Sequence, residues 1–150
     1  MVDIPPEVQI RSTLRCGSVF YRKEESFVGD DPHYFVVLNR DPACDDRLVL
    51  INATSKLDKA RARNLNPATL VIVTKGQYSD LRDDSAFEGD STIVRTVDQL
   101  VAKAEQGEVT RLHGYMPDSI VQMLQAAVLA SRQITGELKK LIDPNWVEPT

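Results

Sequence analysis

The 150-residue sequence has the length of one ordinary domain, and its 42% hydrophobic and 27% charged residues are typical of globular proteins. This composition excludes a chain that is disordered throughout, and the formal net charge of −4 counts against binding of nucleic acid by blanket phosphate contacts. No apolar run approaches the roughly 20 residues that span a membrane, and the N-terminal segment lacks a signal-peptide pattern, so we expect a cytoplasmic protein.

The pattern of residues predicts an arm, a strand-rich domain and a tail. Residues 1–14 contain two consecutive prolines and few apolar side chains, so we expect an extended arm before a domain at 15–142 and a tail at 143–150. Short β-strands are predicted at 15–22, 33–38, 48–53, 69–74, 91–96 and 108–113. Residues 56–66 are interpreted as a short helix or a loop, and 97–106 as a short helical turn. Residues 77–90 show no clear pattern.

A change of period near residue 118 predicts a long C-terminal helix. Asp118 can cap its N-terminus, and apolar side chains between residues 121 and 141 fall near one helical face. Lys139 and Lys140 complement the negative end of the helix dipole, and Pro144 stops the helix. Several short strands followed by one long helix predict a mainly β protein with α-helix, in the form of a small barrel or curled sheet.

The two cysteines give no sign of a metal site. Cys16 and Cys44 show no CxxC or Cys/His spacing, so we expect no metal and no cofactor. Cys16 opens a predicted strand and is interpreted as a buried thiol. Cys44 lies among aspartates, whose charge raises the pKa of a thiol and argues against a reactive nucleophile.

Several short blocks of the sequence resemble the MazF/PemK (Kid-like) toxins of toxin–antitoxin systems. These blocks are GSVFY at 17–21, HYFVVL at 33–38, LINATS at 50–55, DSTIVRT at 90–96 and MPDS at 116–119. The fourth block is similar to the family strand that carries a catalytic or RNA-contacting arginine. Together with the C-terminal helix, the resemblance extends roughly from residue 16 to residue 141.

The resemblance implies both a fold and an activity. The implied fold is a small SH3-like (Kid/CcdB-like) barrel closed by a long C-terminal helix, usually as a homodimer. The implied activity is metal-independent cleavage of single-stranded RNA, neutralised by an antitoxin protein. The chain departs from the family pattern at His33 and Tyr34, where many members have an Arg-Pro pair, and the loop before His33 is acidic.

Four residues in these blocks are candidates for catalysis. RNA transesterification needs a base for the ribose 2′-hydroxyl, an acid for the leaving oxygen and a donor for the charge on the phosphate. His33 is the candidate acid or base and Arg95 the candidate charge stabiliser, while Thr54 and Ser55 can donate hydroxyl hydrogen bonds to the phosphate. Structural roles remain open for each: local hydrogen bonding at strand ends, or a surface ion pair for Arg95.

A basic segment follows the third predicted strand. Lys56, Lys59, Arg61 and Arg63 are candidate RNA-binding residues, or form a solvated polar face.

Two alternatives to an endoribonuclease remain. The first is a catalytically inactive PemK-like binding or regulatory module, which the net acidity and the missing arginine before the second strand favour. The second is a barrel that acts on a protein target, as CcdB-type relatives do.

Overall fold

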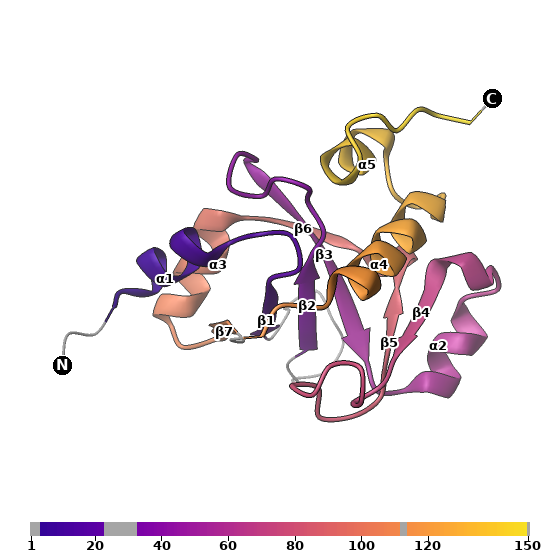
Figure 1. Ribbon diagram of the computed structural model, residues 1–150, viewed down its shortest axis with the longest axis horizontal. Coiled ribbons are helices and arrows are strands. Elements are labelled where there is room, and N and C mark those ends of the chain that lie inside the picture. The colour runs from indigo at the N-terminus through magenta and orange to yellow at the C-terminus, as the bar shows by residue number, and fades with distance from the viewer. Residues whose placement is uncertain (1–3, 23–32, 112–113, 150) are drawn as a thin grey trace.

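The computed structural model describes residues 4–22, 33–111 and 114–149, which form a mixed α and β fold (Figure 1). The strands are β1 (Val19–Arg22), β2 (His33–Val37), β3 (Arg47–Thr54), β4 (Leu70–Val73), β5 (Ser85–Glu88), β6 (Ile93–Thr96) and β7 (Val109–Arg111). The α-helices are α1 (Pro6–Thr13), α2 (Leu57–Arg63), α3 (Val97–Glu105), α4 (Asp118–Ala130) and α5 (Gly136–Ile142). Across these residues, no helix has the length and apolar character needed to cross a membrane. The predicted loop at 23–32 lies outside the described residues.

The strands form one antiparallel sheet in the order β4-β5-β3-β2-β1-β7, with β6 also paired to β3. The long strand β3 is central, because its first half pairs with β6 and its last two residues pair with β5. A 3₁₀ turn at Gly89–Ser91 separates β5 from β6, which pair with different parts of β3. Among the described residues, β4 and β7 at the two ends of this order do not pair. The sheet is therefore open, and the closed barrel expected from the resemblance is not formed by these pairings.

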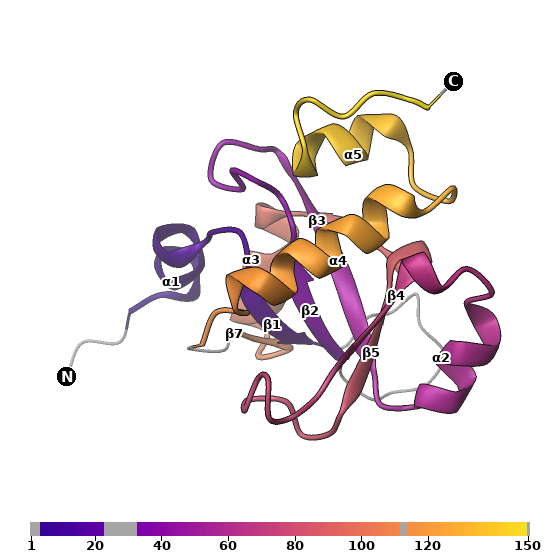
Figure 2. The same ribbon diagram turned by 45° about the vertical axis from the view of Figure 1, so that its right-hand side comes forward.

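Alternation of side chains along the strands divides the core into two clusters. One cluster contains Val49 and Ile51 of β3 and lies under Leu124 and Val128 of α4. The other contains Leu48 and Leu50 of β3, together with side chains of α1 and α3. Figure 2 shows α4 lying across one face of the sheet, while α1 and α3 contact one another and share the second cluster with the strands.

The N-terminal segment is a helix and part of the core. Pro6 is the first residue of α1, a position where its missing backbone N–H leaves no helical hydrogen bond unmade. Ile10 and Leu14 are buried in the second cluster, and Arg11 forms an ion pair with Asp98 of α3. The prediction of an extended arm at residues 1–14 is therefore wrong for the described residues, because α1 buries apolar side chains against the sheet.

The C-terminal region forms two helices, so the prediction of one long helix is wrong. Asp118 is the first residue of α4 and not its N-cap, which is Pro117 and makes no side-chain capping bond. The helix ends at Ala130, and the next residue, Ser131, has an extended backbone and a hydroxyl that donates to the carboxylate of Asp90. Thr135 then starts α5, because its hydroxyl oxygen accepts a hydrogen bond from the backbone N–H of Leu138 at 3.5 Å. Such side-chain bonds compete with a continuous helix and explain the break.

Candidate functional site

A hollow of about 380 Å³ lies at one end of the sheet, where β1 and β3 end and β2 and β5 begin. Its lining consists of Tyr21, His33, Tyr34, Ala53, Thr54, Ser55, Lys56, Arg82, Asp83 and Ser85. Most side chains buried by the sheet are apolar, whereas this end collects an imidazole, hydroxyls, charged groups and two tyrosine rings. The hollow therefore brings together side chains that can transfer a proton, donate hydrogen bonds and carry charge.

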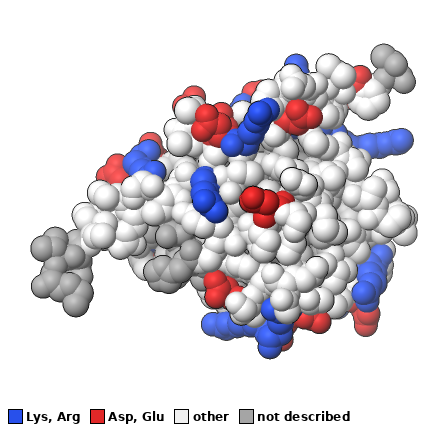
Figure 3. Space-filling view, viewed as in Figure 1, with Lys and Arg blue, Asp and Glu red and all other residues white. Residues whose placement is uncertain are grey.

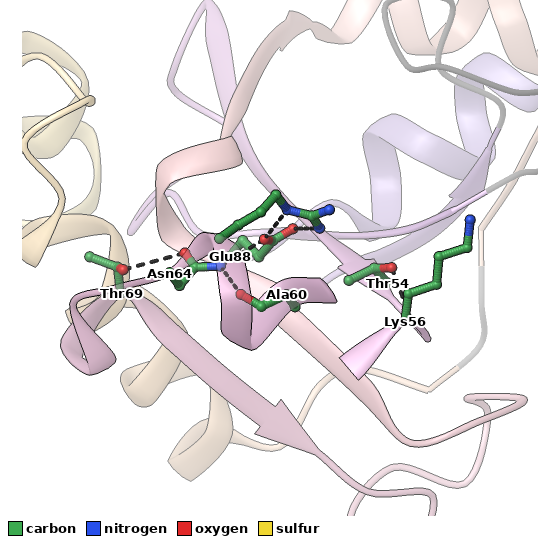
Figure 4. A network of polar contacts seen from close by, with 7 residues as sticks. Thr54, Lys56, Ala60, Asn64, Thr69 and Glu88 are labelled. Atoms are coloured by element: carbon green, nitrogen blue, oxygen red, sulfur yellow. Dashed lines mark hydrogen bonds and ion pairs between the residues drawn. The ribbon is translucent and has the colours of Figure 1, made fainter. Parts of the chain in front are cut away.

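Strand register brings His33 close to Thr54. Phe35 of β2 lies opposite Asn52 of β3 in the antiparallel pair, so the start of β2 and the end of β3 lie at the same end of the sheet, and both His33 and Thr54 line the hollow. The Thr54 hydroxyl oxygen accepts a hydrogen bond from the backbone N–H of Lys56 at 3.2 Å, as drawn in Figure 4. A hydroxyl that accepts a bond keeps its own hydrogen for another acceptor. The structure thus brings together three of the four catalytic candidates, with Ser55 beside Thr54.

The fourth candidate, Arg95, lies at the other end of β3. It is paired with Leu48, six residues before Thr54, which corresponds to roughly 20 Å along an extended strand. Its Nη1 atom donates a hydrogen bond of 2.6 Å to the carbonyl oxygen of Val94. Arg95 is not among the residues that line the hollow. The structure therefore does not bring Arg95 together with His33, Thr54 and Ser55 within this chain.

The arginine that lines the hollow is Arg82, and not Arg95 as expected from the sequence. Arg82 belongs to the segment between β4 and β5, and its guanidinium carbon lies 5.2 Å from the ring centroid of Tyr21. Side chains from both faces of the sheet border the hollow: Tyr34 packs against the cluster under α4, whereas His33 alternates to the opposite face. The sequence pattern missed Arg82 because it lies outside the predicted strands and outside every block of the resemblance.

The basic residues of α2 extend the hollow along the surface. Lys56, Lys59 and Arg61 line a shallow second hollow of about 460 Å³, which shares Ser55 and Lys56 with the first. Arg61 lies 3.8 Å from Asp58, and both side chains are exposed. On the face seen in Figure 3, basic side chains along the lower edge are interspersed with acidic ones. This face therefore shows localised cations among acidic side chains and not a broad basic patch.

Arg63, the fourth basic candidate, is bound to the sheet. Its Nε and Nη2 atoms donate hydrogen bonds of 3.0 and 2.9 Å to the two carboxylate oxygens of Glu88. Asn64 donates a third bond of 2.7 Å to the same carboxylate, which is 5% exposed (Figure 4). The hydrogen bond to Glu88 raises the pKa of Arg63 above its ordinary value. These contacts show that Arg63 holds α2 on β5, and its contact with RNA stays a prediction.

We expect Arg63→Ala to lower the free energy of unfolding by about 1–3 kcal/mol, because the buried carboxylate of Glu88 loses its bidentate partner. Arg61→Ala on the same helix is the matched control, and we expect it to change stability by less than about 0.5 kcal/mol, since its ion pair is exposed. Urea denaturation of both variants measures the difference. Equal stability of the two variants would show that the bond between Arg63 and Glu88 does not hold α2.

The larger hollow of about 510 Å³, between α1, α3 and the β2–β3 turn, carries less reactive chemistry. Its arginine, Arg11, is paired with Asp98. A hydrogen bond to Asp41 raises the pKa of the Cys44 thiol, and burial raises the pKa of the Cys16 thiol, so neither is an activated nucleophile. No group of three or more His, Cys, Asp or Glu side chains in the described ranges is placed to hold a metal ion.

No protein-family model matches the sequence, and no curated protein matches it. The chemistry of the hollow is therefore inferred from the side chains that line it. The imidazole of His33 can donate or accept a proton, Thr54 and Ser55 can donate hydrogen bonds, and Lys56 and Arg82 supply positive charge. This set of groups can bind a phosphate and transfer a proton beside it.

Proposed function

We propose that the chain is a metal-independent endoribonuclease that cleaves single-stranded RNA in the hollow at the sheet end. The observation that carries the proposal is the shared lining of one hollow by His33, Thr54, Ser55, Lys56 and Arg82. An imidazole, two hydroxyls and two cations supply the proton transfer and charge stabilisation that RNA transesterification requires. The hollow beside α1 and α3 and the shallow hollow beside α2 do not combine these groups.

In the proposed reaction, the ribose 2′-oxygen attacks the adjacent phosphorus while the bond from phosphorus to the 5′-oxygen breaks. The products are a 2′,3′-cyclic phosphate and a new 5′-hydroxyl. His33 transfers one of the two protons, and Asp83, the carboxylate of the hollow, is the candidate for the other. Arg82 and Lys56 stabilise the charge that develops on the phosphate oxygens, and the neighbouring hydroxyls donate hydrogen bonds to the same oxygens.

The resemblance to MazF/PemK toxins supports the same activity and adds partners to the proposal. A sheet that curls around the long strand β3, with α4 across one face, is in keeping with an SH3-like barrel opened between β4 and β7. In this proposal the protein is a cytoplasmic homodimer that an antitoxin protein neutralises. Lys56, Lys59 and Arg61 contact RNA along the shallow hollow beside α2.

The test is cleavage of a fluorescent single-stranded RNA in excess EDTA. We expect the wild-type protein to cleave it, and Arg82→Ala to lower the rate by about 10²- to 10³-fold, because a charge stabiliser is lost. Arg95→Ala is the matched control, since it removes an arginine at the far end of β3, and we expect it to keep the wild-type rate. Loss of activity in Arg95→Ala but not in Arg82→Ala would overturn the assignment of the cation.

Two outcomes would favour the alternatives. Binding of RNA without cleavage by the wild-type protein would point to a catalytically inactive PemK-like binding or regulatory module. Growth arrest on expression without loss of cellular RNA would point to a protein target.

A further inference from the structure

Two tyrosine rings and a guanidinium form a layered wall on one side of the hollow. The ring centroids of Tyr21 and Tyr34 lie 4.7 Å apart with their planes inclined by 43°. The guanidinium carbon of Arg82 lies 5.2 Å from the Tyr21 centroid. All three side chains line the hollow beside Thr54 and Ser55. A flat cation and two flat rings thus border the same space as the groups assigned to the phosphate.

These tyrosines differ from the other aromatic side chains of the sheet. Phe20, Phe35 and Phe87 are fully buried in the two core clusters, whereas Tyr21 and Tyr34 are only partly buried. The Tyr34 hydroxyl donates a hydrogen bond of 3.1 Å to the backbone carbonyl oxygen of Asp80, which fixes the direction of its ring. Burial raises the pKa of Tyr34, so the hydroxyl stays neutral at physiological pH. The wall is therefore an uncharged aromatic surface with one cation at its edge.

We infer that this wall is a subsite for the unpaired base of a nucleotide next to the scissile phosphate. The inference rests on the proposed ribonuclease function and names the part of the substrate that the hollow recognises. Proteins bind unpaired bases by stacking them on tyrosine rings and on arginine guanidinium groups. The hollow of about 380 Å³ falls within the range of roughly 300–1,000 Å³ that holds small organic ligands.

Stacking on this wall also explains how single strands are selected. A base in a duplex is paired and stacked on its neighbours, and extruding it costs a few kcal/mol. A base in a single strand has no such partner to give up. The subsite therefore favours single-stranded RNA although the net charge of the chain is −4 and the hollow itself is lined by only one lysine and one arginine, Lys56 and Arg82.

Binding of two oligonucleotides separates base recognition from phosphate recognition. Both are fully 2′-O-methylated single-stranded RNAs of equal length, which cannot undergo transesterification, and one is abasic at every position. Fluorescence anisotropy measures their affinities. We expect Tyr21→Leu to weaken binding of the intact oligonucleotide by about 5- to 100-fold, and Tyr21→Phe to retain wild-type affinity. Neither substitution is expected to change binding of the abasic oligonucleotide.

The chain offers a matched control for loss of a tyrosine that contacts an arginine. The guanidinium carbon of Arg15 lies 3.6 Å from the ring centroid of Tyr115, and neither residue lines the hollow. We expect Tyr115→Leu to leave the affinity for both oligonucleotides unchanged. Urea unfolding of each variant shows whether a loss of affinity comes from a loss of folded protein.

The possible outcomes distinguish this inference from the proposed function. Unchanged affinity of folded Tyr21→Leu for the intact oligonucleotide, or an equal loss for the abasic one, would overturn the base subsite even if the wild-type protein cleaves RNA. Wild-type protein that discriminates intact from abasic strands through Tyr21, but does not cleave natural RNA, would overturn the ribonuclease and keep the subsite. Failure to bind either oligonucleotide would overturn both.

Discussion

Replacing His33 by glutamine is expected to lower the rate of RNA cleavage by about 10²- to 10⁴-fold, because an amide cannot transfer a proton in the transition state. Glutamine keeps a polar side chain that can hydrogen-bond at the start of β2. We therefore expect RNA binding and stability to stay near their wild-type values. Single-turnover cleavage in excess EDTA measures the chemical step, and anisotropy with a methylated RNA measures binding.

Chemical rescue provides the control for this prediction. His33→Ala removes the side chain at the rim of the hollow, and we expect added imidazole to restore part of the activity by taking its place. His33→Gln fills the same space, so imidazole should have little effect on it. A structural role for His33 would produce no rescue in either variant. Cleavage by His33→Gln at close to the wild-type rate would show that His33 does not transfer a proton.

The sequence could predict those site residues that stand at the ends of strands recognisable from the local pattern of residues. His33 opens a run of apolar residues that predicts a strand, and Thr54 and Ser55 close another, so their place at strand ends could be read from the sequence. Antiparallel pairing of β2 with β3 then brings these ends together. Arg95 also lies on a predicted strand, but its distance from the site depends on which half of β3 it pairs with. Register between strands distant in sequence is a tertiary property.

The residues that the sequence analysis missed lie in segments with weak local patterns. Strand β5 has the sequence SAFE, which lacks β-branched residues and includes a glutamate. That glutamate, Glu88, is buried only because Arg63 and Asn64 satisfy its carboxylate, and these partners are more than 20 positions away. Arg82, just before β5, was missed with it. The local alternation of apolar and polar residues cannot predict β5, because the burial of its glutamate depends on partners far away in the sequence.

Helix limits were mispredicted for a related physical reason. Prolines at positions 5 and 6 favour an extended chain when they are taken alone, yet Pro6 also fits the first turn of a helix. Burial of Ile10 and Leu14 against the sheet decides between the two conformations. In the C-terminal region, apolar spacing suggested continuity, but the bond from Ser131 to Asp90 favours a break. In both places a tertiary contact overrides the local preference.

Replacing Gly89 by alanine is expected to lower the free energy of unfolding by about 1–3 kcal/mol or more, through overpacking at the bend between β5 and β6. A Cβ atom at Gly89 would lie 2.5 Å from the carbonyl oxygen of Ala127 and 2.8 Å from its carbonyl carbon. These are backbone atoms of α4, so the clash cannot be relieved by a side-chain rotation. Leu124 and Val128 of α4 are fully buried, and any shift of the helix disturbs their packing.

The matched control for this substitution is Gly76→Ala. A Cβ atom at Gly76 would meet only the Thr74 hydroxyl oxygen, at the ordinary contact distance of 3.7 Å, so we expect a change within about 0.5 kcal/mol. Urea denaturation with a common m-value compares the two variants. Because β5 begins at Ser85 in the lining of the hollow, we also expect Gly89→Ala to slow RNA cleavage more than Gly76→Ala does. Equal stability of the two variants would show that α4 does not pack tightly against the bend. It would also contradict the proposal that this contact holds β5 in place at the hollow.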